Sequence, residues 1–336
     1  MNIGLIGIGY WGPNLVRNFS ALDDVKITAV CDLRSERLEA IRKHFPAIKV
    51  FTTDANEIIN SPDIDAVAVV TPVSTHFPIG MEVLASGKHL FIEKPFTATV
   101  EQAERMIELA EQKNLRIMVD HTFLYTGAVE TMKKYIDNGE LGELYYFDSV
   151  RVNLGLFQHD VNVIWDLAPH DVSIMDYLLD RAPRAISATG VSHIDSGVEN
   201  IAYISTYYDN NLLGHIHVNW LAPVKVRKTL VSGSKKMMIY DDMEPHEKIK
   251  IYDNGVEITE DKDQIYNVLI QYRTGDMVSP KVDLTEALKK VTLEFYNSIN
   301  ENRNPRTDGH AGLRVVRILE AANKSIRSNG QLIEIK

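Results

Sequence analysis

The chain has 336 residues, of which 45% are hydrophobic and 24% charged, a composition typical of a globular protein long enough for two domains. The formal net charge of −10 argues against nucleic acid or an anionic membrane as a partner. The single cysteine, Cys31, cannot form an internal disulfide, and no apolar run approaches the ~18 residues of a membrane span. Because no signal-peptide pattern precedes the first apolar segment, we expect a cytoplasmic protein.

The first dozen residues contain a glycine motif between two predicted elements. Residues 3–8 have the apolar, β-branched character of a strand buried on both faces, and residues 14–22 have helical spacing. Glycines in the spacing G-x-G-x-x-G allow a tight turn, close approach of the backbone to a pyrophosphate, and close packing of helix and strand. The helix start also favours an anion. The motif therefore predicts a dinucleotide site that contains Gly7, Ile8, Gly9, Tyr10, Trp11 and Gly12.

An acidic residue ends the next predicted strand, residues 26–31. Asp32 follows Gly12 by twenty residues, the spacing of an acceptor for the adenosine ribose hydroxyls. A carboxylate there repels the 2′-phosphate of NADP, whereas Arg34 can stack on adenine or pair with that phosphate. We therefore expect NAD before NADP. The alternative is a glycine turn in an α/β domain that binds no nucleotide.

Strands and helices continue to alternate up to residue 121. We expect helices at residues 35–45, with Ser35 as the cap, 56–59, 75–85 and 100–112, and strands at 50–51, 66–70, 89–92 and 116–119. This order predicts a doubly wound parallel sheet, so residues 1–121 form a Rossmann domain of the α/β class. Ligands of such sheets bind at the carboxyl ends of the strands. Further candidate cofactor contacts on that edge are Thr71, Pro72, His76, Glu93, Lys94, Pro95 and His121.

These motifs resemble those of the glucose–fructose oxidoreductase/inositol dehydrogenase/rhizopine catabolism (Gfo/Idh/MocA) family, over nearly the whole chain. The most specific match is Glu93-Lys94-Pro95, whose lysine in that family contacts nicotinamide and substrate. From the residues alone, Lys94 is a cation at a strand end that can polarise a hydroxyl or carbonyl oxygen, with Glu93 holding the ammonium and Pro95 fixing the turn. The alternative is a solvated lysine at a strand end.

The second half, residues 122–336, predicts an α+β domain with a large open, mostly antiparallel sheet. One helix is expected at residues 128–138, and the candidate strands are 144–152, 184–192, 200–208, 212–220, 228–232, 236–240 and 248–252. In strands 203–208 and 215–220, apolar or aromatic residues occur at both odd and even positions, so they lie on both faces of the sheet. A sheet with one face in water requires them on one face only. The resemblance implies that this open sheet joins subunits. We therefore expect a homo-oligomer, either a dimer or a tetramer.

A helix opening near Trp165 and ending at Leu179 carries the second candidate site. Asp166 and His170 are four residues apart, so both project from one helix face. A carboxylate beside an imidazole orients the ring and raises its pKa, as in a general base that accepts a hydroxyl proton. The resemblance assigns acid/base chemistry to His170 and a substrate contact to Asp166. The family more often has glycines before this motif, where this chain has residues 162–165. The alternative is an aspartate cap with a structural histidine.

Other candidates are weaker. His215 and His217 lie on one strand face, but no nearby Cys or carboxylate completes a metal shell, so no metal site is predicted. Gly233-Ser234-Lys235 lacks the spacing of a phosphate loop. Tyr10 and Trp11 either cover the cofactor or pack against the helix. A helix starting at Gly309 closes the fold.

The sequence therefore favours an NAD(P)-dependent oxidoreductase acting on a secondary hydroxyl of a sugar, nucleotide-sugar or cyclitol. In this hypothesis His170 takes the hydroxyl proton, and Lys94 and Asp166 orient the oxygen. Two alternatives are a non-catalytic regulator that senses the cofactor on the same fold, and a reductase of a small imine or carbonyl compound. A sensor would have no need to retain all three side chains.

Overall fold

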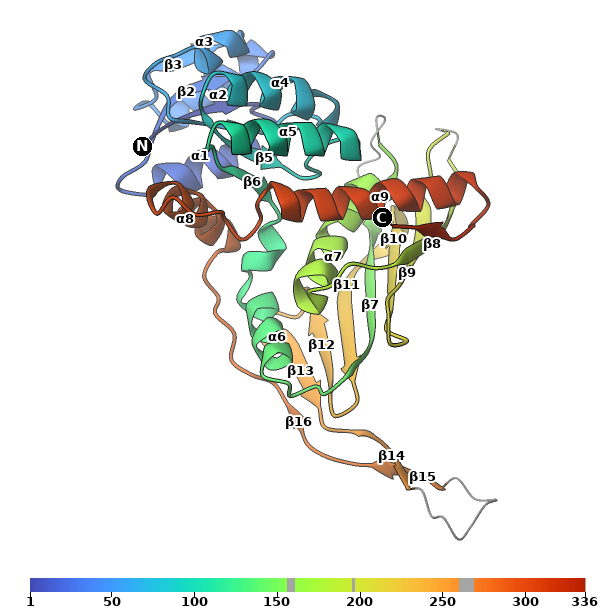
Figure 1. Cartoon of the computed structure of the whole chain (residues 1–336). Coiled ribbons are helices and arrows are strands. Elements are labelled where there is room, and N and C mark those ends of the chain that lie inside the picture. The colour runs from blue at the N-terminus through green and yellow to red at the C-terminus, as the bar shows by residue number, and fades with distance from the viewer. Residues whose placement is uncertain (156–160, 195–196, 260–268, 336) are drawn as a thin grey trace. The chain divides into compact units, whose positions relative to one another are not determined.

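The computed structural model describes residues 1–155, 161–194, 197–259 and 269–335 (Figure 1). The chain divides into two compact units, and each has its own sheet. The first unit contains residues 1–125 and 285–320, and the second contains residues 126–284 and 321–336. Across the described residues, no helix is both long enough and apolar enough to cross a membrane.

The sheet of the first unit is doubly wound, which confirms the predicted fold class. Within the described residues it has six strands in the order β3-β2-β1-β4-β5-β6, and all of its strand pairs are parallel. Its strands are buried almost throughout, as expected of apolar strands covered on both faces. Their bounds are β1 Asn2–Ile6, β2 Lys26–Cys31, β3 Val50–Thr52, β4 Ala66–Val69, β5 His89–Glu93 and β6 Ile117–Asp120.

Helices cover both faces of this sheet. They are α1 Gly12–Ser20, α2 Ser35–His44, α3 Ala55–Ile59, α4 Val73–Ala85, α5 Val100–Gln112, α8 Ala287–Asn300 and the first part of α9 Gly309–Arg327, with a 3₁₀ turn at Thr122–Tyr125. Ser35 is the first residue of α2 and not its cap. Arg34 occupies the cap position and makes no side-chain cap hydrogen bond there.

Residues 285–320 were expected to belong to the second domain, but in the structure they belong to the first unit. Helix α8, which was not predicted, packs its Phe295 ring edge-on against Phe19 of α1 and Phe91 of β5, with ring centroids 6.2 and 5.5 Å apart. All three rings are fully buried. This aromatic cluster accounts for the return of the chain to the first sheet, because large buried rings contribute strongly to a core.

The second unit contains a mostly antiparallel sheet. Within the described residues it has nine strands in the order β16-β13-β12-β11-β7-β10-β9-β8-β17, with one parallel pair between β7 and β10. A separate ribbon pairs β14 with β15. The elements are α6 Gly127–Asp137, β7 Leu144–Leu154, α7 Val163–Leu179, β8 Ala185–Val191, β9 Ile201–Tyr207, β10 Leu213–Asn219, β11 Leu221–Gly233, β12 Met237–Asp241, β13 Ile249–Tyr252, β14 Gly255–Thr259, β15 Leu269–Arg273, β16 Met277–Val278 and β17 Ile333–Glu334.

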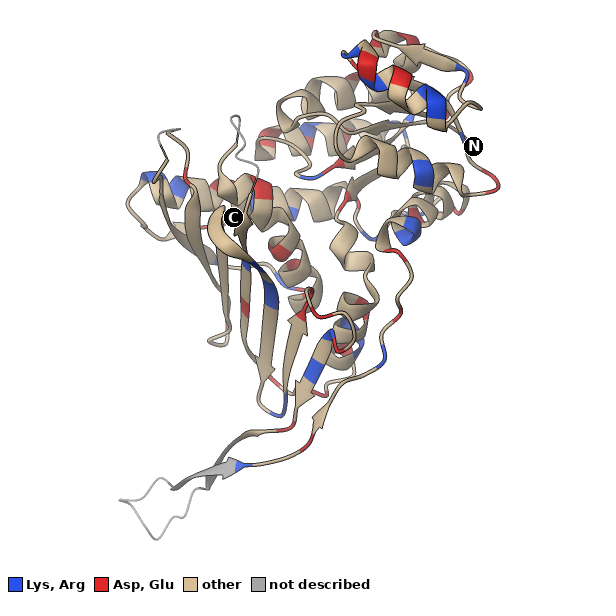
Figure 2. Ribbon diagram, turned by 180° about the vertical axis from the view of Figure 1, so that it is seen from behind, with Lys and Arg blue, Asp and Glu red and all other residues tan. Residues whose placement is uncertain are grey.

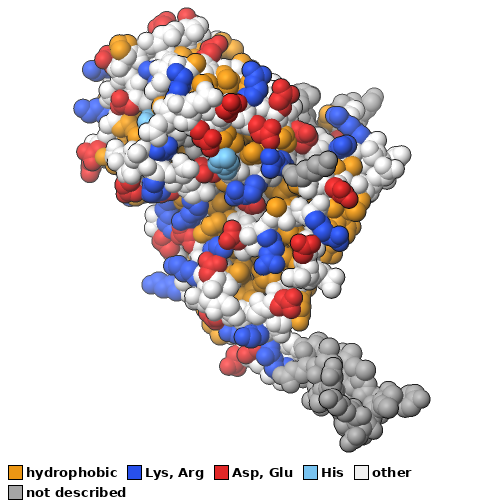
Figure 3. Space-filling model, in the orientation of Figure 1, with side chains coloured by type: hydrophobic (Ala, Val, Ile, Leu, Met, Phe, Trp, Pro, Cys, Tyr) orange, Lys and Arg blue, Asp and Glu red, His pale blue; other side chains and the backbone are white. Residues whose placement is uncertain are grey.

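One face of the central strands is buried and the other is open. Ile204 and Ile216 are fully buried on the face that α7 covers, where an added Cβ on Gly214 would lie 2.7 Å from the sulfur of Met175. On the opposite face Tyr203 is 44% exposed, and its ring is stacked with that of His217 at 4.4 Å and with that of His215 at 6.1 Å between centroids. Exposed hydrophobic side chains are visible over the second unit in Figure 3. In Figure 2, acidic and basic residues are interspersed along the helices and strands of each unit.

Candidate functional site

The glycine turn between β1 and α1 has the tight geometry that its sequence predicts. Gly7 has a φ of +103°, and a Cβ there would lie 2.4 Å from the carbonyl oxygen of Val70. A Cβ on Gly12 would lie 2.5 Å from the carbonyl oxygen of Gly7. At Gly9 the nearest neighbour of an added Cβ is a guanidinium nitrogen of Arg37, 3.9 Å away. The first and third glycines are therefore required by the protein itself, whereas Gly9 leaves open space beside the backbone.

The amino end of α1 fits an anionic group. Trp11 stands at the cap position and makes no side-chain cap hydrogen bond, and a proline lies in the first turn. A helix start without a side-chain acceptor keeps its partial positive charge available for a ligand. The turn and this helix start together fit the pyrophosphate of a dinucleotide.

Asp32 is fixed directly after β2. Its Oδ2 accepts the backbone N–H of Ile8 at 2.7 Å, and its Oδ1 accepts that of Arg34 at 2.9 Å. The guanidinium of Arg37 also lies 3.3 Å from Oδ2. Arg34 thus contributes its backbone here while its side chain is exposed, and Arg37 is the arginine that pairs with Asp32. Arg37 was not among the predicted site residues, although its place in the first turn of α2, close after the acidic residue, is a signal that could have found it.

His76 has a structural environment. It is 1% exposed, and its Nδ1 and Nε2 lie 2.9 Å from the Pro95 carbonyl oxygen and 2.8 Å from that of Thr71. Burial lowers the pKa of His76, so the ring is neutral. Both nitrogens lie against backbone carbonyl oxygens, and the neutral ring can donate to one of them, so His76 lies between the turn at Thr71-Pro72 and the turn after β5. The Lys94–Pro95 peptide bond in that second turn is cis.

Glu93, Lys94 and Asp120 meet where β5 and β6 end. Glu93 and Asp120 are direct partners in the parallel pairing of the two strands. Asp120 accepts hydrogen bonds from the Thr122 hydroxyl at 2.6 Å and from the Trp11 indole at 3.3 Å. Trp11 is thereby joined to the strand edge, while Tyr10 remains 89% exposed. The glycine turn and the Lys94 turn are thus connected through side chains.

His121 follows this cluster and is unusually isolated. It is 1% exposed, and neither ring nitrogen has a hydrogen-bond partner among the described residues. Burial is the main cause that lowers the pKa of His121 to about 3, and Lys94 and Arg314 add to the shift. An imidazole that stays neutral can offer a donor and an acceptor, but it cannot contribute positive charge near neutral pH.

The start of α7 is held by a network of side chains. The carbonyl oxygen of the Asn162 side chain accepts the N–H of Trp165 at 3.2 Å, which makes Asn162 the cap. Its amide nitrogen donates to Glu199 at 2.8 Å and to Asn323 at 2.9 Å. The alternative in which Asp166 caps the helix therefore does not hold, because Asn162 is the cap.

Asp166 and His170 share the partly exposed face of α7, while most of the helix is buried. The indole of Trp220, which is fully buried, donates to Oδ2 of Asp166 at 2.9 Å. On the buried side of the helix, Asp171 forms an ion pair with Arg151 of β7. The helix is thus anchored by its buried residues, and the indole orients the Asp166 carboxylate. Trp220 was not predicted as a site residue, because it is distant in the chain and carries no local signal.

The cofactor candidates of the first unit therefore gather at one sheet edge, and Asp166 and His170 form a separate group in the second unit. Tyr125, in the 3₁₀ turn after β6, is buried, and its ring is covered by Arg306. Among the described residues, no group of three His, Cys, Asp or Glu could hold a metal ion. His215 contacts Asp148 at 3.2 Å on the open sheet face.

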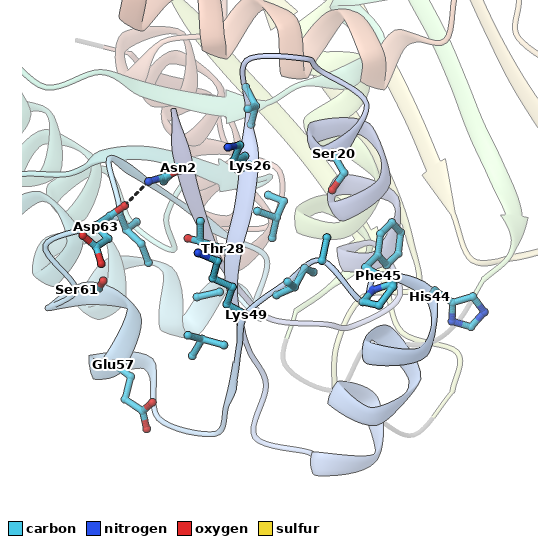
Figure 4. Close-up of a pocket in the computed structure, with 18 residues that line it drawn as sticks. Asn2, Ser20, Lys26, Thr28, His44, Phe45, Lys49, Glu57, Ser61 and Asp63 are labelled. Carbon is cyan, nitrogen blue, oxygen red and sulfur yellow. Dashed lines mark hydrogen bonds between the residues drawn. The ribbon is translucent and has the colours of Figure 1, made fainter.

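A pocket of about 900 Å³ lies elsewhere in the first unit. It opens at the amino ends of the strands, where Asn2, Lys26 and Lys49 line it together with Phe45, as Figure 4 shows. The strands are parallel, so this edge is opposite to the one that carries the glycine turn. The pocket is therefore distinct from the candidate cofactor site.

Comparisons with known proteins agree with this arrangement. Residues 1–121 match the family model described as "Oxidoreductase family, NAD-binding Rossmann fold", and residues 129–239 match that of the GFO/IDH/MocA C-terminal domain. Together the two models span most of the chain.

Several similar proteins are dehydrogenases. Myo-inositol 2-dehydrogenase of Thermotoga maritima is 23% identical over 97% of this chain and 96% of its own length. UDP-N-acetylglucosamine 3-dehydrogenase of Acidithiobacillus ferrooxidans is 23% identical over 94% of both chains. The fold is also that of levoglucosan dehydrogenase in complex with NADH and levoglucosan, with a TM-score of 0.83 and 20% identity over 100% of this chain and 99% of that one.

Proposed function

Because the chain belongs to the Gfo/Idh/MocA family and is an NAD-dependent oxidoreductase, we propose that it oxidises a secondary hydroxyl, or reduces the matching ketone, of a sugar, nucleotide-sugar or cyclitol. The observation that carries this proposal is the retention of Lys94, Asp166 and His170, each at the motif position that the family uses. Relatives that act on cyclitols and on a UDP-sugar support the substrate class.

NAD would be held by the glycine turn of Gly7, Gly9 and Gly12 and by Asp32, and it supplies the hydride acceptor when bound. In our proposal His170 accepts the proton of the substrate hydroxyl, and Asp166 orients the imidazole and favours its protonated form. Lys94 polarises the same oxygen and stabilises its developing negative charge. Exposed Tyr10 and the turn residues Thr71 and Pro72 contribute further cofactor contacts.

We propose NAD before NADP because Asp32 is buried and would repel a 2′-phosphate. Arg37 opposes this preference, because its guanidinium already lies beside Asp32 and can pair with a phosphate. We expect a preference of about tenfold, or ~1.4 kcal/mol. Titration of both reduced cofactors by fluorescence measures it, and tighter NADPH binding would overturn the assignment.

The open face of the second sheet supports a homo-oligomer, either a dimer or a tetramer, because Tyr203 and Leu213 are exposed large side chains on that face. Light scattering at micromolar concentration tests this expectation, and a monomer mass would refute it. A cytoplasmic location fits the single cysteine, which is buried and reduced.

The substrate experiment has two steps. Mass spectrometry of small molecules that remain bound to the purified protein identifies the cofactor and any sugar-like ligand. NADH formation is then measured with myo-inositol, levoglucosan and UDP-N-acetylglucosamine, with an imine reduction assay beside them. Turnover of a hydroxyl compound supports the proposal. Reduction of the imine alone would favour the non-sugar alternative.

A further inference from the structure

Two carboxyl groups lie next to each other at the carboxyl edge of the first sheet. Glu93 ends β5 and Asp120 ends β6, and they are paired across the two strands. Asp120 is 1% exposed, and Oε1 of Glu93 is buried without a hydrogen-bond partner among the described residues. Burial and mutual repulsion oppose the ionisation of both neighbouring carboxyl groups, so without a further positive charge the pair holds one proton.

The hydrogen bonds indicate which carboxyl keeps that proton. Both oxygens of Asp120 accept bonds, Oδ1 from Thr122 and Oδ2 from Trp11, and such bonds favour the ionised form. Among the described residues Glu93 accepts at one oxygen only: its Oε2 accepts the backbone N–H of Lys94 at 3.2 Å, and its Oε1 accepts none. Burial and then the charge of Asp120 raise the pKa of Glu93 well above its ordinary value. The proton therefore resides on Glu93.

Two histidines and a tyrosine also lie near the Glu93–Asp120 pair. Each of them keeps one protonation state near neutral pH, so the pair is the group that can release a proton. Burial lowers the pKa of His76 and that of His121, so both rings are neutral, and burial raises the pKa of Tyr125, which keeps its proton. The positive charge of Lys94 acts on both carboxyl groups of the pair, and those of Lys94 and Arg314 act on His121. A further positive charge at this edge would favour loss of the proton from Glu93.

The bound cofactor can bring such a charge. A dinucleotide places its adenosine ribose at the acidic residue after β2 and its pyrophosphate at the glycine turn after β1. In the strand order, β5 and β6 lie on the other side of β1 from β2, so we expect the nicotinamide half on their side. The nicotinamide ring is positively charged in NAD⁺ and neutral in NADH.

We propose that the Glu93–Asp120 pair releases its shared proton when NAD⁺ binds and keeps it when NADH binds, so that pH sets the preference for the oxidised cofactor. The proton passes from the Glu93 carboxyl to solvent, and the pair changes from one negative charge to two. This inference rests on the cofactor and not on the substrate class. NAD⁺ affinity rises by up to about tenfold per pH unit within the window where the proton is released, while NADH affinity stays constant.

Isothermal titration calorimetry in two buffers of different ionisation enthalpy counts the protons exchanged on binding. We titrate the full chain with NAD⁺, NADH and ADP-ribose, which lacks the nicotinamide, between about pH 6 and pH 9. The expected result is release of up to about one proton with NAD⁺ and of less than about 0.2 with the other two ligands.

Three variants assign the proton. Glu93→Gln should abolish the release, and Asp120→Asn should shift it to lower pH, because Glu93 then titrates without its charged neighbour. Glu143→Gln, at an exposed carboxylate of the second unit, should behave as the parent. Circular dichroism verifies folding, and if Glu93→Gln does not fold, the shift in Asp120→Asn decides.

Two results would overturn the inference alone: NAD⁺ binding without proton release in the parent, or undiminished release in Glu93→Gln. No binding of NAD⁺ to the parent would overturn the cofactor assignment as well.

Discussion

The two helices that begin at the candidate sites, α1 and α7, start in opposite ways. Helix α1 has glycines before it and no side-chain cap, so its backbone is left for a ligand. Helix α7 has its cap, Asn162, bonded to three partners, and Asp166 is held by Trp220. The amino end of α1 offers main-chain groups to a ligand, and the amino end of α7 fixes the direction of side chains. Cofactor binding and proton transfer should therefore be separable by mutation.

The largest expected effect is on turnover, and it comes from a change near the amino end of α7. His170→Ala removes the proposed proton acceptor and should lower kcat by ~10²–10⁴-fold, while the Kd for NADH changes by less than about twofold. The substrate found in the panel serves for the rate, and NADH fluorescence serves for binding. His246→Ala, at an exposed histidine, is the control. Turnover in His170→Ala within about threefold of the parent would refute the mechanism.

Gly9→Ala should weaken cofactor binding at the amino end of α1 without disturbing the fold. An added Cβ meets no protein atom closer than 3.9 Å, so the melting temperature should stay unchanged, but the methyl group occupies the space through which a pyrophosphate approaches. We expect NADH affinity to fall ~10–100-fold. Gly12→Ala is the matched comparison, because its Cβ would lie 2.5 Å from a backbone oxygen and should lower the melting temperature as well. Unchanged NADH affinity in Gly9→Ala would contradict the assignment.

The pH dependence of stability tests the burial of His121 at the carboxyl edge of the first sheet. Its pKa of about 3 in the folded chain lies below the ordinary value of 6.5, so the unfolded chain binds the extra proton, and stability falls as pH drops below 6.5. The penalty at pH 5 is about 2 kcal/mol. His121→Asn should remove it, so that the difference in unfolding free energy between pH 8 and pH 5 shrinks by about that amount. Urea unfolding at both pH values measures the difference, and an unaltered difference would mean that His121 titrates normally.

Asn162→Ala should destabilise the amino end of α7 and leave that of α1 unchanged. Loss of a helix cap costs ~1–2 kcal/mol, and here two further hydrogen bonds are lost with it. We expect a lower free energy of unfolding and reduced turnover, because the direction of Asp166 depends on the first turn of α7, while NADH affinity is retained. Asn138→Ala, at an exposed asparagine after α6, is the control. A loss of NADH affinity in Asn162→Ala would contradict the expectation that cofactor binding and proton transfer can be separated by mutation.

Local patterns predicted the elements whose environment is uniform along the chain. The buried strands of the first sheet and helix α5 were found within a residue or two, because burial on both faces or on one helical stripe imposes a clear period. The glycine motif and Asp32 were informative because their geometry depends on spacing within one βαβ unit.

Features that depend on distant partners were not predictable in this way. Strand β11 is longer than expected, because residues 221–227 include a proline and basic side chains that do not resemble a strand until they pair with β7. The parallel pairing of β10 with β7 and the bond from Trp220 to Asp166 likewise join residues far apart in the chain. The environment of His76 depends on two turns that only the folded sheet brings together.

The return of α8 to the first sheet has a consequence for synthesis on the ribosome. Phe19 and Phe91 emerge early, but their partner Phe295 is made only after the whole central part of the second sheet. Until then, Phe19 and Phe91 of a nascent first unit have only each other in this aromatic cluster, and the third ring that completes it is missing. Completion of the cofactor-binding unit is therefore delayed until late in translation. A truncated chain ending near residue 125 is expected to aggregate and to fold poorly, even though it contains every residue of the glycine turn.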